Sequence, residues 1–351
     1  MKRTVLLVFC LTLVSCTACS SAPTQGYENI ATEAQVESEP PTVLKIGCQS
    51  AEDSSEVRVL KYFEQLVEER SKHALDIQIF PSSALGPVGD MAEGVSLGTI
   101  EMAAIGFNSY ATYCSDFAIY DLWSFHGPED FVQLYESEVG KKLNSELLTS
   151  SGIRILTYNL CSPGQLYFWG NKEIRTVDDY NGLRVRTNGL ATVDFAIAAF
   201  GGIPTAVSWT DMYSALQTKV IDVGFGDVEN LLTSGYGGIV TYRYTGLENY
   251  LGSSVCISEK VWQSLSGELQ IIIEKALKEA CQDFARKVYE EKVRSGEESL
   301  RQTGIETLTM DPAEKDKMAL IIREASEAYL NTVVLPEILE EAKPYFSTFD
   351  G

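Results

Sequence analysis

Histidine and basic residues are scarce in this chain of 351 residues. The only two histidines are His73 and His126. So few argue against a multi-histidine metal site and leave few candidates for a Ser-His or Cys-His catalytic centre. Lys and Arg number 28 against 49 Asp and Glu, so the formal net charge is −21. Such an acidic body lacks the basic footprint that nucleic-acid binding needs, and anionic lipid repels it.

Long apolar runs are also missing, and the short run at residues 5–14 cannot span a bilayer. Lys2 and Arg3 precede this run, as in the charged and apolar regions of an export signal. The run ends in Leu13-Val14-Ser15-Cys16, which resembles the lipobox of bacterial lipoproteins. The resemblance implies cleavage before Cys16 and a diacylglycerol on its thiol, with Cys19 as a second choice. The alternative is an ordinary secretory peptide that happens to contain cysteines.

We therefore predict a lipoprotein signal peptide over residues 1–15, a flexible tether over 16–42 and a folded body beyond. The tether is rich in Ser, Thr, Glu, Gln and Pro and cannot bury a core. Hydrophobic residues make up 45% of the whole chain, which is ordinary for a globular protein, and the length is enough for two domains. No cysteine pair in the body has CxxC spacing, so we predict no particular disulfide.

Strands and helices are expected to alternate through most of the body. Expected strands lie at 43–47, 75–80, 100–105, 153–156, 183–186 and 220–223, and expected helices at 55–70, 86–98, 176–182, 191–200 and from 208. The β-α-β rhythm runs once over the first part and restarts near residue 153, which predicts two lobes with open, largely parallel sheets. The last third is expected to be helical, with a long helix from about Glu268 to beyond Arg294 and another starting at Asp311.

Five segments carry a more specific pattern. They are 182–186 (GLRVR), 199–205 (AFGGIPT), 208–222 (SWTDMYSALQTKVID), 81–86 (PSSALG) and 98–102 (GTIEM). Together they resemble the signatures of solute receptors from tripartite ATP-independent periplasmic (TRAP) transporters. The similarity runs from about Leu44 to Ala285, and several ordered motifs at matching spacing are more specific than any single one.

The resemblance implies a two-lobed α/β fold like that of periplasmic binding proteins, with no catalysis and no cofactor. Each lobe would be a mixed, largely parallel sheet flanked by helices, and the long C-terminal helix would span both. Lobe I would hold 43–157 with 247–285, and lobe II 158–246 with 286–351 and the C-terminal helices. Crossovers are expected near 156–160 and at a turn near Thr245 and Gly246. The lobes would close on an organic acid and deliver it to a membrane permease driven by an ion gradient.

Arg186 matches the arginine that grips the ligand carboxylate in this family. A guanidinium is always charged and pairs bidentately with a carboxylate, so the chemistry suits that role. Arg184 lies on the same strand face by period-2 counting, and spacing alone does not choose between the two. Trp209 matches an aromatic residue that lines the pocket, or else is a core tryptophan. Gln49 matches a polar position facing the cleft, or else is a loop residue.

The chain also departs from the family pattern. Acid-binding relatives often carry an asparagine-containing stretch where this chain has Val223-Gly224-Phe225-Gly226-Asp227. Leu166 stands where a second arginine is often found, Trp123 replaces the proline of a Leu-Pro pair, and Phe107 is expected where the first lobe meets the cleft. The full set of expected ligand-binding residues is Arg186, Trp209, Gln49, Phe107, Trp123, Leu166, Phe168, Asn188, Phe225 and Gly226.

These departures lead to the hypothesis that the pocket keeps one carboxylate clamp and is apolar elsewhere. The ligand would then be an amphipathic or aromatic monocarboxylate. The equal alternative is that the aromatic residues are core and other residues make the pocket polar.

Rival functions are a structural or sensory lipoprotein on the same fold, or an exported hydrolase. No GxSxG or HExxH motif supports a hydrolase, although paired carboxylates for glycoside hydrolysis stay open in so acidic a chain. Asp227 and Glu229 could contact a ligand or a cation, but nothing in the sequence distinguishes them from ordinary surface acids.

Overall fold

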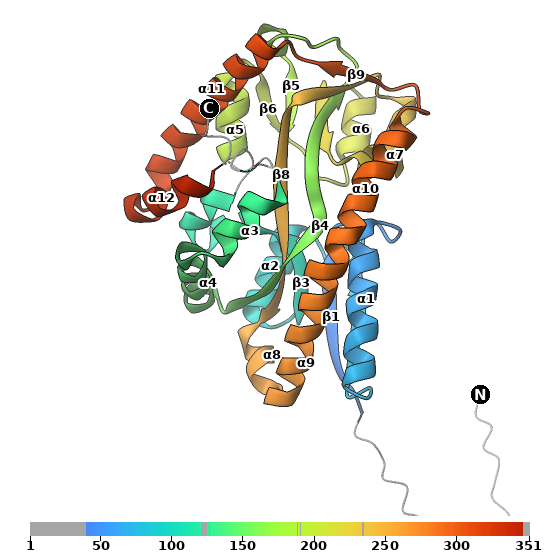
Figure 1. Ribbon diagram of the computed structural model, residues 1–351, viewed down its shortest axis with the longest axis vertical. Coiled ribbons are helices and arrows are strands. Elements are labelled where there is room, and N and C mark those ends of the chain that lie inside the picture. Colours follow the sequence, from blue (N-terminus) through green and yellow to red (C-terminus); the bar gives the residue numbers. More distant parts are fainter. Residues whose placement is uncertain are drawn as a thin grey trace, which may run out of the picture. The chain divides into compact units, whose positions relative to one another are not determined.

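The computed structural model describes residues 40–120, 125, 127–187, 189, 191–233 and 235–346 (Figure 1). The expected signal peptide, Cys16 and almost all of the tether lie outside these residues, and so do Trp123 and Asn188. Within the described part, no helix combines the length and the apolar composition needed to cross a membrane. Cys48, Cys114 and Cys256 are free thiols.

The first half of the body has the β-α-β-α-β order that the sequence predicts. Its strands are β1 (Thr42–Cys48), β2 (Leu75–Phe80) and β3 (Met102–Gly106), and its helices are α1 (Ser55–Arg70), α2 (Val88–Leu97), α3 (Pro128–Glu136) and α4 (Glu138–Ser151). Strand β1 pairs in parallel with both β2 and β3. Helix α1 starts where Ser54 accepts the N–H of Val57, a side-chain cap that fixes the first turn.

The second half is built around shorter strands. They are β5 (Arg184–Thr187), β6 (Ile203–Ala206), β7 (Val223–Gly226) and β9 (Glu306–Thr309), with helices α5 (Ala191–Ala199), α6 (Met212–Gln217) and α7 (Val228–Thr233). Strand β5 pairs in parallel with β6 and β7. Where a helix over 176–182 is expected, the structure has a short 3-10 turn at Val177–Tyr180 that begins with a capping box of Thr176 and Asp179. Helix α6 begins four residues after Ser208, because Ser208 caps a separate turn through the N–H of Asp211.

Two long strands join the halves. Strands β4 (Ile153–Gly170) and β8 (Tyr242–Ser258) pair antiparallel with one another along most of their length. One end of β8 pairs with β3 and the other with β9, while the far end of β4 pairs with β7. Each lobe therefore has its own mixed sheet, and both sheets share β4 and β8. Thr245 and Gly246, where a turn at the second crossover is expected, lie inside β8. Gly246 has a φ of +110°, and the pairing of β8 with β4 shifts register between Tyr244 and Asn249, so the strand is irregular here and the crossover stays a prediction.

The apolar cores follow the same division. One large cluster fills the first half, and two smaller clusters lie around β4–β7 and around α6 and α7. The end of α11 (Pro312–Val333) and α12 (Pro336–Ala342) pack into the first core through Leu330, Ile338 and Phe346. This differs from the expected placement of 286–351 with lobe II. The carboxyl-terminal helices thus also cover the first half, while the lobe boundaries stay a prediction.

The long C-terminal helix consists of three consecutive segments. Helix α9 (Gly267–Leu277) passes through a π-helical segment at Lys278–Phe284 into α10 (Ala285–Leu300). Helix α10 packs against α1 in one half and α7 in the other, so this helix spans both lobes as expected (Figure 1). The short helix α8 (Glu259–Ser264) precedes it, with Ser258 as its N-cap residue.

Candidate functional site

Arg186 is a buried cation near the end of β5. Its side chain leaves the strand among apolar neighbours, and the residue is only 5% exposed. The Nε atom donates a hydrogen bond to the Val207 carbonyl at 3.0 Å. Burial lowers the pKa of Arg186 to about 10, because an apolar environment disfavours the charged form. The guanidinium therefore stays protonated at neutral pH despite its surroundings.

Aromatic rings surround this guanidinium. Its central carbon lies 4.8 Å from the ring centre of Phe225 on β7 and 5.8 Å from that of Trp209. The ring of Phe168 on β4 lies 5.7 Å from the ring of Phe225, so it forms a second row of apolar contact. Cation–π attraction of this kind becomes stronger when water is excluded. We call Arg186, Trp209, Phe225 and Phe168 the Arg186 site.

No anion of the described chain neutralises Arg186. Within the residues that the structure describes, no carboxylate lies within ion-pair distance of it, and only its Nε has a protein acceptor. A buried charge without a partner is costly, whereas a bidentate carboxylate would satisfy both terminal nitrogens. The arrangement can therefore bind one carboxylate group in an apolar setting.

Arg184, two residues earlier, is engaged within the protein. Its Nε lies 2.9 Å and its Nη2 3.1 Å from the two carboxylate oxygens of Asp222, and its backbone N–H donates to the same side chain. This ion pair lowers the pKa of Asp222, and the Arg184 side chain is 40% exposed. The two arginines that the spacing could not separate thus differ in their partners, and Arg186 is the one without an acidic partner among the described residues.

Gly226 and Tyr236 complete the surroundings of the Arg186 site. A Cβ at Gly226 would lie 2.5 Å from Cη2 of Trp169 and 2.9 Å from Cη2 of Trp209, so only glycine lets both indoles approach. Tyr236 is buried, and burial raises its pKa to about 12 while the charge of Arg186 lowers it. Sequence reasoning missed Trp169 and Tyr236. The glycines beside Tyr236 give no signal of close packing, because Gly235 adopts a φ of +76° in a turn and nothing lies within 4 Å of a Cβ at Gly237.

The remaining candidates are not part of this group. Leu166 is buried in the same core cluster as Phe168. Gln49 is half-buried just after β1. Phe107 is fully buried in the first core and contacts four rings, those of Tyr110, Tyr120, Phe131 and Tyr135. In the described part of the chain, no contact joins Gln49 or Phe107 to Arg186.

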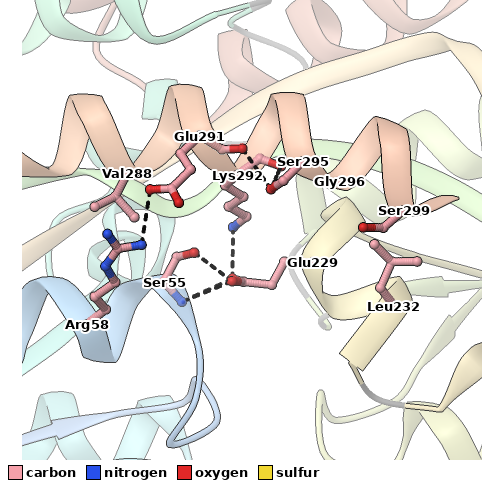
Figure 2. Close-up of a pocket in the computed structure, with 10 residues that line it drawn as sticks. All are labelled: Ser55, Arg58, Glu229, Leu232, Val288, Glu291, Lys292, Ser295, Gly296 and Ser299. Atoms are coloured by element: carbon pink, nitrogen blue, oxygen red, sulfur yellow. Dashed lines mark hydrogen bonds and ion pairs between the residues drawn. The ribbon is translucent and has the colours of Figure 1, made fainter.

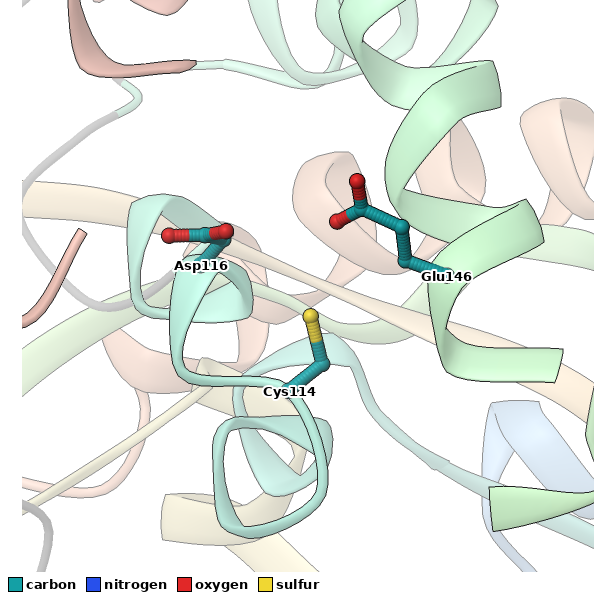
Figure 3. Close-up of side chains that lie close together, drawn as sticks. All are labelled: Cys114, Asp116 and Glu146. Atoms are coloured by element: carbon teal, nitrogen blue, oxygen red, sulfur yellow. The ribbon is translucent and has the colours of Figure 1, made fainter. Parts of the chain in front are cut away.

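One cluster has the atoms that a metal would need. The ligand atoms of Cys114, Asp116 and Glu146 lie within 4.8 Å of one another (Figure 3). One Asp116 oxygen already accepts the N–H of Leu335 at 2.7 Å, and burial raises the pKa of the Cys114 thiol. A raised pKa disfavours the thiolate that a metal binds, so proximity alone does not make this cluster a metal site.

Comparison with known proteins gives a consistent result. Residues 46–332 match the family described as "Bacterial extracellular solute-binding protein, family 7". The chain is 25% identical over 266 residues to the C4-dicarboxylate-binding periplasmic protein DctP of Rhodobacter capsulatus, covering 75% of this chain and 79% of that protein. The sialic acid-binding periplasmic protein SiaP of Vibrio cholerae is 27% identical over 248 residues, covering 67% of this chain and 73% of that protein.

Solved structures share the fold. The sugar acid binding protein DctPAm of Advenella mimigardefordensis, in complex with galactonate, superposes with a TM-score of 0.81 at 20% identity. That match covers 87% of this chain and 97% of the other. A TRAP periplasmic solute binding protein from Desulfovibrio salexigens with bound orotic acid gives a TM-score of 0.79 at 23% identity, covering 87% and 98%. The two-lobed architecture is therefore the one seen in these binding proteins.

Proposed function

Because the chain belongs to the bacterial extracellular solute-binding protein family 7, the solute receptors of TRAP transporters, we propose that Arg186 is its carboxylate clamp. The family is one of binding proteins rather than enzymes, and its members bind organic acids. The observation that supports the clamp is the buried guanidinium with no acidic partner among the described residues. Its two terminal nitrogens form the fork that a carboxylate fits.

We further propose that the ligand is an amphipathic or aromatic monocarboxylate. Phe225 and Trp209 lie against the one described cation of the site, Phe168 packs behind Phe225, and the buried Leu166 stands where the family often has a second arginine. Burying the apolar surface of one large side chain contributes about 1.5–3 kcal/mol, so a few ring contacts can replace a second ion pair. One solved relative is described with bound orotic acid, a ring that bears a single carboxylate.

The cellular setting follows from the same proposal. Its relatives are named periplasmic proteins. We place this chain in the periplasm, held to the membrane by a lipid on Cys16 and passing its ligand to TRAP permease subunits. Palmitate labelling of the full chain, compared with a Cys16→Ala variant, tests the anchor. Label that persists in the variant contradicts lipidation at Cys16.

Calorimetric titration of the tether-free body tests the ligand class. Phenylacetate and orotate represent aromatic monocarboxylates, and succinate and galactonate represent the polar acids. We expect binding of an aromatic acid and loss of at least about 30-fold in affinity in Arg186→Ala, because a buried charged contact contributes about 2 kcal/mol or more. Tight binding of succinate with none of the aromatic acids would overturn the apolar pocket but leave the receptor assignment standing.

A further inference from the structure

A second group of charges lines a cavity of about 300 Å³ between α1, α7 and α10, and none of the residues of the Arg186 site lines it. Figure 2 shows Glu229 of α7 pointing toward the start of α1, with Lys292 of α10 above it. One Glu229 oxygen lies 2.6 Å from the Oγ of Ser55, and the two oxygens lie 3.2 and 3.1 Å from the Ser55 backbone nitrogen. These bonds join residues 174 positions apart, on helices of the two halves.

The start of α1 is suited to this contact. The first N–H groups of a helix have no partner within the helix and carry the positive end of its dipole. Ser54 caps the N–H of Val57, while the N–H of Ser55 goes to Glu229. Ser55 is 8% exposed, so its N–H is largely shielded from water. A carboxylate of the second half thus completes the capping of the first helix of the first half.

Glu229 is held in place from its own side. The Nζ atom of Lys292 lies 3.5 Å from Glu229 and 2.7 Å from Asp227, and the Lys292 side chain is only 8% exposed. Asp227 in turn accepts the N–H of Asn230 at 2.7 Å, which fixes the first turn of α7. Lys292 comes from α10, Glu229 from α7, and Asp227 directly precedes α7. Their arrangement therefore does not need α1, and Glu229 stays aimed at the place where α1 docks.

We propose that Glu229 is an interlobe latch, which stabilises the closed arrangement of the two lobes through Ser55 even without a ligand. This inference rests on the proposed function at one point: a receptor of this kind must open its lobes to admit a ligand. When the lobes part, Ser55 and Glu229 exchange their mutual bonds for water, so the latch adds a fixed contribution to the closed state. Ligand contacts then shift an equilibrium that the protein has already biased.

The test measures closure in the ligand-free protein. Azide-bearing residues at Leu97 and Ile203, which are 64% and 49% exposed in different halves, carry a dye pair without involving the native cysteines. Single-molecule energy transfer then reports the ratio of closed to open molecules. We expect Glu229→Ala to lower this ratio about tenfold, as the loss of charge-assisted hydrogen bonds predicts. Ser55→Ala keeps the backbone N–H and should move the ratio in the same direction by less.

Glu291→Ala is the matched control. Glu291 lines the same cavity and pairs with Arg58 at 3.2 Å, but both side chains are more than half exposed, so its loss should leave the ratio unchanged. Equal ratios in wild type and Glu229→Ala overturn the latch, and so does a wild-type protein with no closed population. If Glu229→Ala fails to fold, Ser55→Ala decides by the same criterion. Failure of every organic acid to bind would refute the proposed function without touching these ligand-free results.

Discussion

The two aromatic groups of this molecule differ in one feature. The Phe107 cluster, which comprises Phe107, Tyr110, Tyr120, Phe131 and Tyr135, lies in the first core, and among the described residues no cation lies over one of its rings. The Arg186 site has similar rings but encloses a guanidinium with no described acidic partner. Rings packed against rings leave no charge uncompensated, whereas burying a charge without a counter-charge is costly. The difference that supports the proposed carboxylate clamp is therefore the unpaired charge and not the aromatic content.

The largest effect that separates the two groups is expected for stability at Phe107. Phe107→Ala should lower the free energy of unfolding by about 3–5 kcal/mol, because a fully buried ring leaves a cavity among four other rings. Urea unfolding followed by circular dichroism measures the change. Phe195→Ala is the matched control, since Phe195 is 53% exposed and should cost much less. Equal losses at the two positions would contradict the core assignment of Phe107.

Gly226→Ala probes how tightly the Arg186 site is packed. The new methyl group would meet the indoles of Trp169 and Trp209, so we expect a loss of about 1–3 kcal/mol in the free energy of unfolding. Because Trp209 would shift, ligand affinity should fall as well. Gly237→Ala is the control, as nothing lies within 4 Å of a Cβ at that position. An unchanged melting temperature in Gly226→Ala would show that the indoles have room to move.

The sequence predicted local structure better than it predicted long-range pairing. Helix α1 and strand β2 have the bounds that periodicity and capping gave. The length of β4 was missed and β8 was not predicted at all, because their residues are held extended by pairing with partners far away in the chain. The strand expected at 220–223 instead starts at Val223, as β7. Residues 218–221 form the turn after α6 and cannot join the strand.

For the site, the family motif singled out Arg186, but only the structure shows why Arg184 is different. Asp222 lies 38 residues beyond Arg184, and no pattern in the sequence announces that pair. Phe107 was counted with the pocket because an aromatic residue after a strand has the same sequence pattern in a core and in a pocket. The ring contacts place it in the core. Burial and pairing partners depend on tertiary contacts, and local sequence does not contain them.

The lowered pKa of Arg186 predicts a moderate loss of ligand affinity at high pH. Its pKa is lowered to about 10, so ligand affinity should be constant from about pH 6 to 9. Above pH 10 the free protein loses this proton while the carboxylate ligand requires it. Affinity should then fall toward tenfold per pH unit, which calorimetric titration at several pH values measures. Arg186→Lys keeps a charge but loses the fork, and should bind more weakly at every pH. A flat profile up to pH 11 would show that burial does not lower the pKa of Arg186 this far.

The smallest effect is expected at Arg184. Its ion pair with Asp222 is 40% exposed on the arginine side, so Arg184→Ala should cost at most about 1 kcal/mol in the free energy of unfolding. The pKa of Asp222 is lowered in the folded protein, so this contribution is present above the carboxyl's usual pKa of 3.8 and is lost as the pH falls through the lowered value. The variant should therefore differ from wild type at pH 7 and converge with it in acid. Ligand affinity should not change, since the Asp222 pair already occupies this guanidinium. Comparable losses of affinity in Arg184→Ala and Arg186→Ala would mean that net positive charge at β5, and not one unpaired guanidinium, attracts the ligand.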